Sequence, residues 1–213
     1  MDIIIALNPS SVLDIGAGFG KYGVLCREYL DLWDGRQKYE FARRIDAVEV
    51  FREYITPLHR FVYSNIYNEN ILTLVNKLDF SYDLVLLIDV LEHFKKEEGV
   101  MIVKKLLSKN NGILISTPRN PSPQKDAFGN VYETHRSKWA KQDLTKIGHC
   151  YFLSDNISII THITKEQNSS HSLDKKIKIM KNLRTRSIIG ALKKRLYSNH
   201  LLRAIYHTKK SFF

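Results

Sequence analysis

Three glycines stand at alternate positions directly after a short apolar run, in the segment Val12-Leu13-Asp14-Ile15-Gly16-Ala17-Gly18-Phe19-Gly20. Glycine tolerates positive φ angles and lets a ligand approach the backbone without a Cβ atom in the way. A helix that starts after Gly20 would add free N–H groups and a positive dipole, which suit an anion or a carboxylate. The segment therefore favours a ligand-binding turn, although a tight strand–helix turn without a ligand would use the same glycines.

The spacing of the glycines separates two kinds of nucleotide site. A dinucleotide site would have the pattern G-x-G-x-x-G. This chain has G-x-G-x-G, with Asp14 two positions before the first glycine. A nicotinamide-dependent dehydrogenase is therefore disfavoured.

Acidic side chains and an imidazole follow two later apolar runs. Glu49 stands near the end of residues 44–50, with Asp46 in the middle of that run. Residues 82–88 lead into Asp89-Val90-Leu91-Glu92-His93-Phe94. In open α/β folds, ligands bind at the carboxyl ends of the strands. The residues at these two ends are therefore candidates for ligand contacts, whereas Asp46 is expected to be a surface or pairing residue.

The elements that must position these residues alternate between strand and helix patterns. Short, strongly apolar runs predict strands at residues 11–15, 44–50, 82–88 and 112–116. Apolar residues three and four apart predict helices at residues 22–32, 95–107 and 139–147, with shorter helical turns at 53–58 and 71–78. Two late runs separated by Ser154-Asp155-Asn156 predict a hairpin of residues 150–153 and 157–163.

This alternation predicts an α/β protein with a doubly wound, mostly parallel sheet, because right-handed crossover connections put helices on both faces. The hairpin adds an antiparallel strand at one edge. Residues 117–131 hold three prolines and separate the strand at 112–116 from the last helix. A loop of this length inside a compact domain is often a lid or a binding loop.

The order of these motifs resembles that of the class I S-adenosylmethionine-dependent methyltransferases, in the subgroup with a D-x-L-E-H turn. The glycine segment resembles motif I, and residues 89–94 are similar to the turn after the fourth strand. Gly112–Pro118 is similar to the fifth strand and its exit, and residues 133–148 look like the stretch before the last hairpin. The resemblance covers about residues 10–164 and implies a seven-stranded sheet.

The resemblance implies S-adenosylmethionine as the cofactor. The residues assigned to cofactor contacts are Asp14, Gly16, Ala17, Gly18, Gly20, Glu49, Asn70 and Asp89. Glu49 would accept hydrogen bonds from both ribose hydroxyls, as an acceptor-only carboxylate can. Asn70 stands where an adenine-binding acid is usual, and its amide could both accept from adenine and donate to it. Lys21 and Tyr22 are candidates for the methionine end, or solvated residues at the helix start.

Two histidines are candidates for a general base, which methyl transfer needs only if the acceptor is protonated, as a hydroxyl is. His93 follows the fourth strand, and His135 lies beyond the long loop, from which it could swing over the same opening. Either could instead order a loop by hydrogen bonding. In some relatives a group like Asp89, Glu92 and His93 holds a divalent metal. Residues so close in sequence need not converge, so no metal ligand is assigned.

The positive charge of the chain is concentrated at one end. The chain has 33 Lys and Arg against 22 Asp and Glu, and residues 175–213 hold twelve of the basic residues and no acidic one. Residues 1–174 are therefore close to neutral. Residues 187–206 predict a basic amphipathic helix. Such a helix could pack on the domain, lie on an anionic membrane surface or bind RNA or another polyanion.

Several classes are disfavoured. No apolar run approaches the roughly 18 residues of a membrane-spanning helix, and the first ten residues lack the basic start of a signal peptide. Two cysteines cannot form a disulfide scaffold, so a cytoplasmic location is expected, with peripheral membrane contact through the tail left open. The Asn/Asp-Pro-Pro-Tyr/Phe motif of DNA amino-methyltransferases is missing after residue 88, so DNA is not expected as a partner.

We therefore expect a methyltransferase domain at residues 1–164, a linker at 165–174 and a basic helical tail at 175–213. Little sequence precedes the first strand, so the long loop or the tail is expected to cover the acceptor. The expected acceptor is a hydroxyl or amine on a small molecule or glycan-like metabolite. Two alternatives remain open: an RNA or protein methyltransferase guided by the tail, and a non-catalytic cofactor-binding partner subunit.

Overall fold

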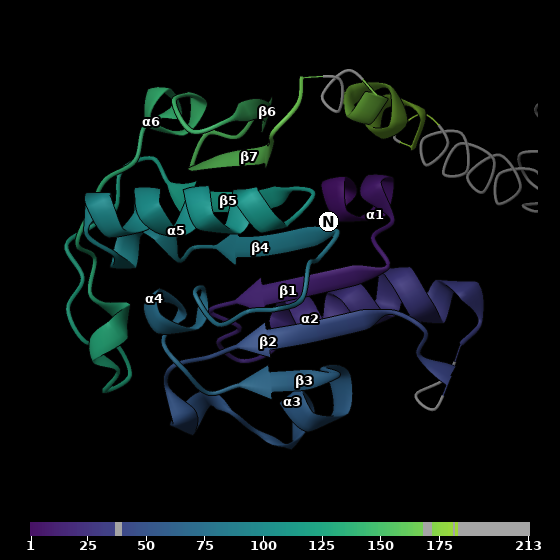
Figure 1. The fold of residues 1–213 in the computed structure, drawn as a ribbon, viewed down its shortest axis with the longest axis horizontal. Coiled ribbons are helices and arrows are strands. Elements are labelled where there is room, and N and C mark those ends of the chain that lie inside the picture. The colour runs from purple at the N-terminus through teal and green to yellow at the C-terminus, as the bar shows by residue number, and fades with distance from the viewer. Residues whose placement is uncertain (37–39, 168–171, 181, 183–213) are drawn as a thin grey trace, which may run out of the picture. The chain divides into compact units, whose positions relative to one another are not determined.

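A computed structural model of the chain describes residues 1–36, 40–167, 172–180 and 182 (Figure 1). The chain divides into two compact units, Met1–Ser170 and His171–Phe213, and the elements below belong to the first. In the second unit, residues 172–180 are helical, so the end of the expected linker at 165–174 is already helix. The expected amphipathic helix at 187–206 lies outside the described residues.

In the described part of the chain, seven strands form one sheet in the spatial order β3-β2-β1-β4-β5-β7-β6 (Figure 1). The strands are β1 (Ser11–Ile15), β2 (Arg44–Val48), β3 (Asn65–Tyr67), β4 (Leu84–Ile88), β5 (Ile113–Pro118), β6 (His149–Leu153) and β7 (Ser158–Thr164). The first five strands are parallel, and β7 is antiparallel to both β5 and β6. The predicted doubly wound, mostly parallel seven-stranded sheet with a C-terminal antiparallel hairpin is confirmed.

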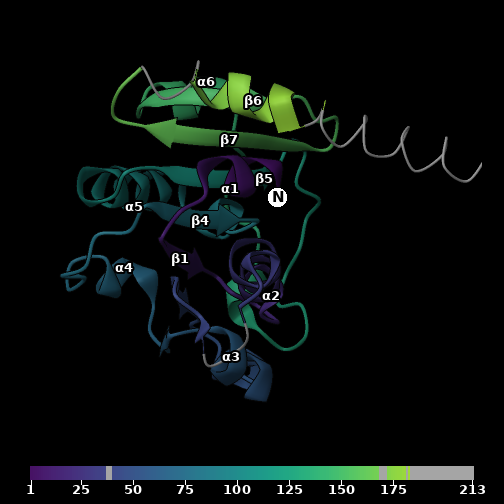
Figure 2. The ribbon, with the colours of Figure 1, turned by 90° about the vertical axis from the view of Figure 1, so that its right-hand side faces the viewer.

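The helices cover both faces of the sheet. They are α1 (Asp2–Leu7), α2 (Lys21–Cys26), α3 (Pro57–Val62), α4 (Ile71–Leu74), α5 (Lys96–Lys109) and α6 (Lys141–Thr145). The predicted helix at 22–32 is α2, which a π-helical turn at Arg27–Asp31 and a 3-10 turn at Leu32–Asp34 continue. Helices α2 and α3 lie on one side of the sheet, and α4 and α5 lie on the other (Figure 2).

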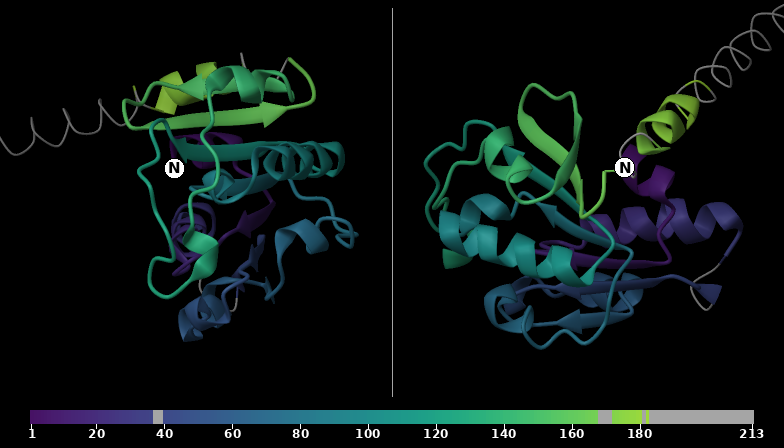
Figure 3. Two further views of the ribbon diagram at one scale, coloured as in Figure 1. Left: turned by 90° about the vertical axis from the view of Figure 1, so that its left-hand side faces the viewer. Right: turned by 45° about the horizontal axis from the view of Figure 1, so that its top comes forward.

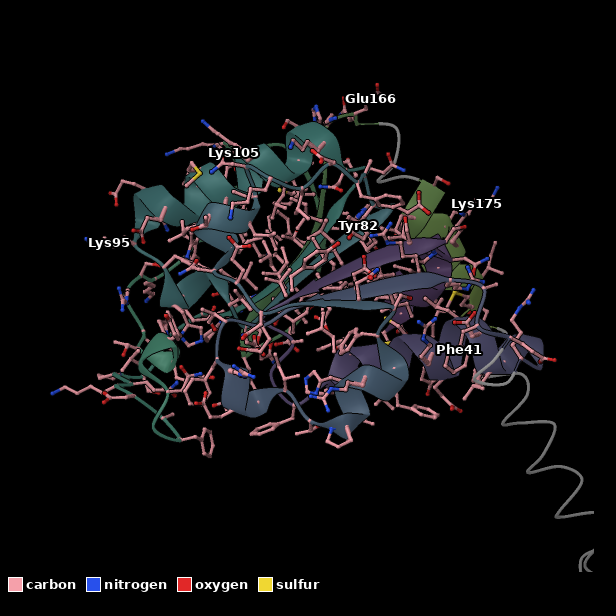
Figure 4. All side chains as sticks on the ribbon, turned by 60° about the horizontal axis from the view of Figure 1, so that its bottom comes forward. Phe41, Tyr82, Lys95, Lys105, Glu166 and Lys175 are labelled. Atoms are coloured by element: carbon pink, nitrogen blue, oxygen red, sulfur yellow. The ribbon has the colours of Figure 1, made fainter. Side chains whose placement is uncertain are left out.

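Helix α5 shows how the apolar pattern attaches a helix to the sheet. Ile102, Val103 and Leu106 are buried in the main core cluster, whereas Lys105 lies on the solvent face of the helix (Figure 4). Each fully buried aliphatic side chain contributes about 1.5–3 kcal/mol relative to an exposed one. This burial, rather than helix propensity, holds α5 against β4 and β5.

Asp46 corrects one sequence expectation. It is fully buried in β2 rather than at the surface. Its carboxylate accepts hydrogen bonds from Arg44 Nε and Tyr82 Oη, both at 2.7 Å, and from Asn65 Nδ2 at 3.0 Å. The expectation of a pairing residue is therefore confirmed, and Asp46 is a polar link between β2, β3 and the start of β4.

The connection between β5 and α6 crosses the carboxyl edge of the sheet, which faces the viewer in the left panel of Figure 3. It is not loop throughout. Residues Ala127 and Asn130 form an isolated β-bridge around Phe128 and Gly129, both of which have positive φ. A 3-10 turn at Val131–Glu133 follows. This path brings the far end of the predicted binding loop back over the strand ends.

Two packed elements had no clear signal in the sequence. Helix α1 precedes β1 and buries Ile3 and Ile4, and the three-residue strand β3 pairs with β2. No helix in the described residues has the length and apolar character to span a bilayer.

Candidate active site

A pocket lies at the carboxyl edge of the sheet, where strand order reverses between β1 and β4. This edge is the standard ligand position in open α/β sheets. The pocket is open and holds about 880 Å³ of empty space, a volume that includes solvent at its mouth. The glycine turn, the ends of β2 and β4, the start of α4 and residues 130–136 of the long connection line it.

The glycine turn has the backbone geometry that its sequence predicts. Gly16, Gly18 and Gly20 all have positive φ, at 70°, 55° and 85°. A Cβ at Gly16 would lie 2.6 Å from Val90 Cγ2, so packing excludes any side chain there. A Cβ at Gly18 would meet only the Gly16 carbonyl oxygen, at 4.0 Å. Gly18 therefore leaves open room on the pocket wall, the room that a ligand close to the backbone requires.

Glu49 connects the glycine turn to the loop after β2. It is 4% exposed and lines the pocket. Its Oε2 accepts a hydrogen bond from the Gly18 N–H at 2.8 Å, and its Oε1 accepts one from the Phe51 N–H at 2.8 Å. Burial raises the pKa of Glu49, and these two N–H groups limit the rise. Each carboxylate oxygen keeps a second lone pair, so the side chain can still accept from two adjacent hydroxyls.

Asp14 lies behind the glycine turn, not on the pocket wall. It is 2% exposed, and its Oδ2 accepts a hydrogen bond from Tyr63 Oη at 2.6 Å. Tyr63 Oη in turn accepts from the Gly23 N–H at 3.1 Å. Burial raises the pKa of Asp14 to about 6, the Tyr63 hydrogen bond opposes this rise, and the charge of Glu49 adds to it. Asp14 is therefore placed to hold the turn and α2 together.

The sequence reasoning missed two residues that shape this turn. His59 is fully buried, and its Nε2 lies 2.9 Å from the Gly18 carbonyl oxygen. Tyr63 acts through Asp14, because its hydroxyl donates a hydrogen bond to the carboxylate that precedes the glycines. His59 belongs to α3 and Tyr63 directly follows that helix, whose apolar pattern carries no sign of this role. Ala17 and Gly20, like Asp14, shape the turn without lining the pocket.

Asn70 and Glu69 also line the pocket. The Asn70 Oδ1 caps α4 by accepting from the Leu72 N–H at 2.9 Å. The cap leaves the side-chain NH₂ available as a donor to a ligand. Glu69 pairs with Lys77 Nζ at 2.5 Å. The adenine contact predicted for Asn70 stays a prediction, with Glu69 as a neighbour that the sequence reasoning did not consider.

Asp89 stands at the end of β4 with an unusual backbone. Its φ is +54°, a conformation that costs a non-glycine residue about 1–3 kcal/mol. Its exposed carboxylate accepts a hydrogen bond from Ser116 Oγ at 2.9 Å. Burial is the main cause that raises the pKa of Tyr22, and the negative charge of Asp89 is the second cause. Asp89 thus lies beside Ser116 of β5 and is not among the residues that line the pocket, and its cofactor contact stays a prediction.

The structure brings the two candidate histidines together, as the prediction of a shared opening requires. The ring centroids of His93 and His135 are 5.1 Å apart. His93 lines the pocket, and its Nε2 lies 3.9 Å from Glu133 Oε2. Burial lowers the pKa of His93, so its imidazole is neutral near pH 7. Glu133, two residues before His135, is a further polar residue of this region that the sequence reasoning passed over.

Glu92 lies beside the histidine pair. It is 2% exposed, and its Oε2 accepts a hydrogen bond from Thr117 Oγ1 at 3.0 Å. Burial raises its pKa to about 7. One ligand atom from each of Glu92, His93 and His135 lies within 4.8 Å of the other two. The group considered from the sequence was Asp89, Glu92 and His93. It does not converge in this way, because Asp89 faces Ser116.

No protein-family model and no curated protein sequence matches the chain. Many solved structures resemble it, among them the following two. An O-methyltransferase family protein from Burkholderia thailandensis has a TM-score of 0.54 and 13% identity, over 76% of this chain and 53% of that one. The N-terminal domain of EvdMO1, solved in the presence of S-adenosylhomocysteine and D-fucose, has a TM-score of 0.51 and 17% identity, over 74% and 77%.

The chain has the fold of the class I S-adenosylmethionine-dependent methyltransferases. The methyltransferase resemblance of the sequence is thereby confirmed at the level of the fold. This methyltransferase-fold chain spans about half the length of the Burkholderia protein. Its pocket, its glycine turn and Glu49 all lie at the sheet edge where this fold binds ligands.

Proposed function

We propose that the chain is an S-adenosylmethionine-dependent methyltransferase that methylates a hydroxyl or amine of a small molecule or glycan-like metabolite. The observation that carries this proposal is Glu49, a buried carboxylate that the Gly18 N–H orients on the wall of an open pocket. The same pocket has His93 on its other side. A nucleoside-binding end and a histidine-bearing end therefore share one opening.

The residues of the glycine end fit the cofactor. Glu49 would accept from the two ribose hydroxyls, the room at Gly18 would receive the ligand close to the backbone, and Asn70 would donate to adenine. When bound, S-adenosylmethionine supplies a methyl group on a positively charged sulfur. The protein then has mainly to align the acceptor atom with that methyl group.

The histidine end fits a polar acceptor. The imidazoles of His93 and His135 can accept a hydrogen bond from an acceptor hydroxyl. The rings of Phe19, Tyr54 and Phe128 form an aromatic cluster, with centroids 4.8 Å apart for Phe19–Tyr54 and 6.3 Å for Phe19–Phe128. Tyr54 Oη connects this cluster to Glu133 Oε1 at 3.3 Å. Phe128 is 79% exposed. Flat, exposed rings are suited to stacking on a planar or sugar ring, which supports a small cyclic acceptor.

Calorimetric titration tests the cofactor assignment. S-adenosylmethionine should bind and NAD should not. Glu49→Gln should weaken binding by about 10–100-fold, the value expected for hydrogen bonds to a charged group. Glu97→Gln is the matched control, because it replaces an exposed carboxylate on α5 with the same carboxamide. It should bind S-adenosylmethionine like the parent protein. Equal binding by the Glu49 variant would contradict the ribose assignment.

Release of S-adenosylhomocysteine tests the reaction. A panel of hydroxyl and amine acceptors should give turnover with at least one compound class. Cofactor binding without turnover on any acceptor, RNA or protein would favour the non-catalytic alternative. Turnover on RNA or protein that disappears when residues 175–213 are removed would favour the tail-guided alternative.

We further propose that the tail contacts an anionic membrane surface or another polyanion. Twelve basic residues and no acidic ones lie in residues 175–213. Near an anionic surface, each basic side chain contributes about 1 kcal/mol. Such contact would place the enzyme peripherally at a membrane.

A further inference from the structure

Three side chains that can bind a metal ion converge beside the pocket. They are Glu92, His93 and His135, whose ligand atoms lie within 4.8 Å of one another. The first two belong to the 3-10 turn after β4, and His135 belongs to the long connection. Glu92 is buried, and no Lys or Arg of the described residues forms an ion pair with it. A buried carboxylate usually has a cationic partner.

Each of these three side chains has a further polar contact that can orient it, as side chains that bind a metal usually have. Thr117 Oγ1 donates to the buried carboxylate at 3.0 Å. The Nδ1 of His93 faces the Thr134 carbonyl oxygen at 3.3 Å. The Nδ1 of His135 faces the Ser122 carbonyl oxygen at 2.6 Å. When Nδ1–H donates to a carbonyl, Nε2 keeps the lone pair that binds a metal.

We propose that Glu92, His93 and His135 form a binding site for a divalent transition metal such as Zn²⁺ or Mn²⁺. Two imidazoles and one carboxylate are a donor set of such ions, whereas Mg²⁺ prefers oxygen ligands and keeps several waters. The sequence alone assigns no metal ligand, because residues close together in sequence need not converge. The difference is His135, which lies 42 positions after His93 and which only the fold brings to it.

The site needs a modest closure to bind a metal. Ligand atoms about 2.1 Å from a tetrahedral ion lie about 3.4 Å from one another, compared with separations of up to 4.8 Å here. His135 is half-buried and stands on the connection rather than on a strand, so its ring can approach without moving the sheet. Glu133 Oε2, 3.9 Å from His93 Nε2, can add a fourth ligand or leave that position to water or acceptor.

The consequence for the acceptor rests on the proposed function. His93 and Glu133 line the pocket that Glu49 also lines, so a metal there could bind an acceptor hydroxyl. Metal binding lowers the pKa of a bound hydroxyl. Its proton would leave to water, its oxygen electron pair would form the new O–C bond, and the C–S pair would return to sulfur. The imidazoles would then be metal ligands rather than bases, and hydroxyl acceptors would be favoured over amines.

Metal titration of the full chain tests the site. After chelator treatment, Zn²⁺, Mn²⁺ and Mg²⁺ are titrated separately in a calorimeter, and Co²⁺ is added as an optical probe of nitrogen ligation. One equivalent of Zn²⁺ or Mn²⁺ should bind, more tightly than Mg²⁺. Loss of a group that hydrogen-bonds to a metal ligand typically weakens metal binding by about 10–100-fold. Thr117→Val should therefore weaken it in this range, and His135→Ala or Glu92→Gln by at least about 100-fold.

His149→Ala is the matched control, because His149 is exposed on β6 and outside the cluster; its metal affinity should equal that of the parent protein. Circular dichroism of each variant checks that it is folded. Weak or absent Zn²⁺ and Mn²⁺ binding by the parent would overturn the site, as would unchanged binding by both His135→Ala and Glu92→Gln. S-adenosylmethionine is titrated on the same samples, so that failure of the proposed function is recorded separately from failure of the metal site.

Discussion

Replacing Asp14 with asparagine should change how the free energy of unfolding depends on pH. Asp14 is buried behind the glycine turn, where Tyr63 Oη donates to it at 2.6 Å. Burial raises its pKa from 3.8 to about 6 in spite of this hydrogen bond. Between these pH values the folded protein keeps a proton on Asp14 that the unfolded chain has already lost.

The magnitude follows from the two pKa values. A difference between 3.8 and about 6 corresponds to about 3 kcal/mol, at about 1.4 kcal/mol per pKa unit. Because the folded-state pKa is the higher one, the free energy of unfolding falls as the pH rises through this window and levels off above it. From pH 4 to pH 7.5, the parent protein should lose about 2–3 kcal/mol through this group. Asp14→Asn should not lose it.

Urea unfolding of both proteins at several pH values measures the effect. The quantity of interest is the difference between their free energies of unfolding at each pH, in which the titrating groups that do not interact with Asp14 cancel. A constant offset from exchanging an oxygen for an NH₂ group does not affect the trend. The exposed Asp126→Asn variant controls for the loss of one carboxylate. A difference that stays constant within about 0.5 kcal/mol would refute the reasoning, since Asp14 would then titrate alike in both states.

Three further outcomes are expected. Gly16→Ala should lower the free energy of unfolding by about 1–3 kcal/mol in urea titration, because φ is +70° and the Cβ would lie 2.6 Å from Val90 Cγ2. Phe128→Ala should leave the melting temperature unchanged but raise the KM for the acceptor, because the ring is 79% exposed within the aromatic cluster. Removal of residues 175–213 should abolish cosedimentation with anionic but not neutral vesicles, while S-adenosylmethionine affinity is retained.

Local sequence patterns predicted the strands and the glycine turn on one side of the pocket. The strands at 11–15 and 82–88 were recognisable because short, strongly apolar runs fit a sheet buried on both faces. The turn at Gly16–Gly20 was recognisable because only glycine takes positive φ without strain. Glu49 followed from its place at a strand end. These properties depend on neighbouring residues, so the chain reveals them without a fold.

Contacts between distant segments were less visible. β3 has only three residues, and its pairing with β2 defines it rather than its own pattern. Asp46 looked like a surface or pairing residue, yet partners from β3 and the start of β4 bury it. Asp14 matched a cofactor motif, but Tyr63, the residue after α3, holds it behind the turn. In each case a residue far along the chain decides the environment.

By itself, the sequence determined the glycine turn, the carboxylate after β2 and the order of the strands and helices other than α1 and β3, because each of these features is encoded within a few neighbouring residues. Only the tertiary structure decided which polar groups meet beside the pocket. The path of the connection after β5 brings His135 to His93 and Glu92, and it leaves Asp89 with Ser116. No local pattern encodes such a meeting, because it depends on how a long connection closes over the packed edge of the sheet.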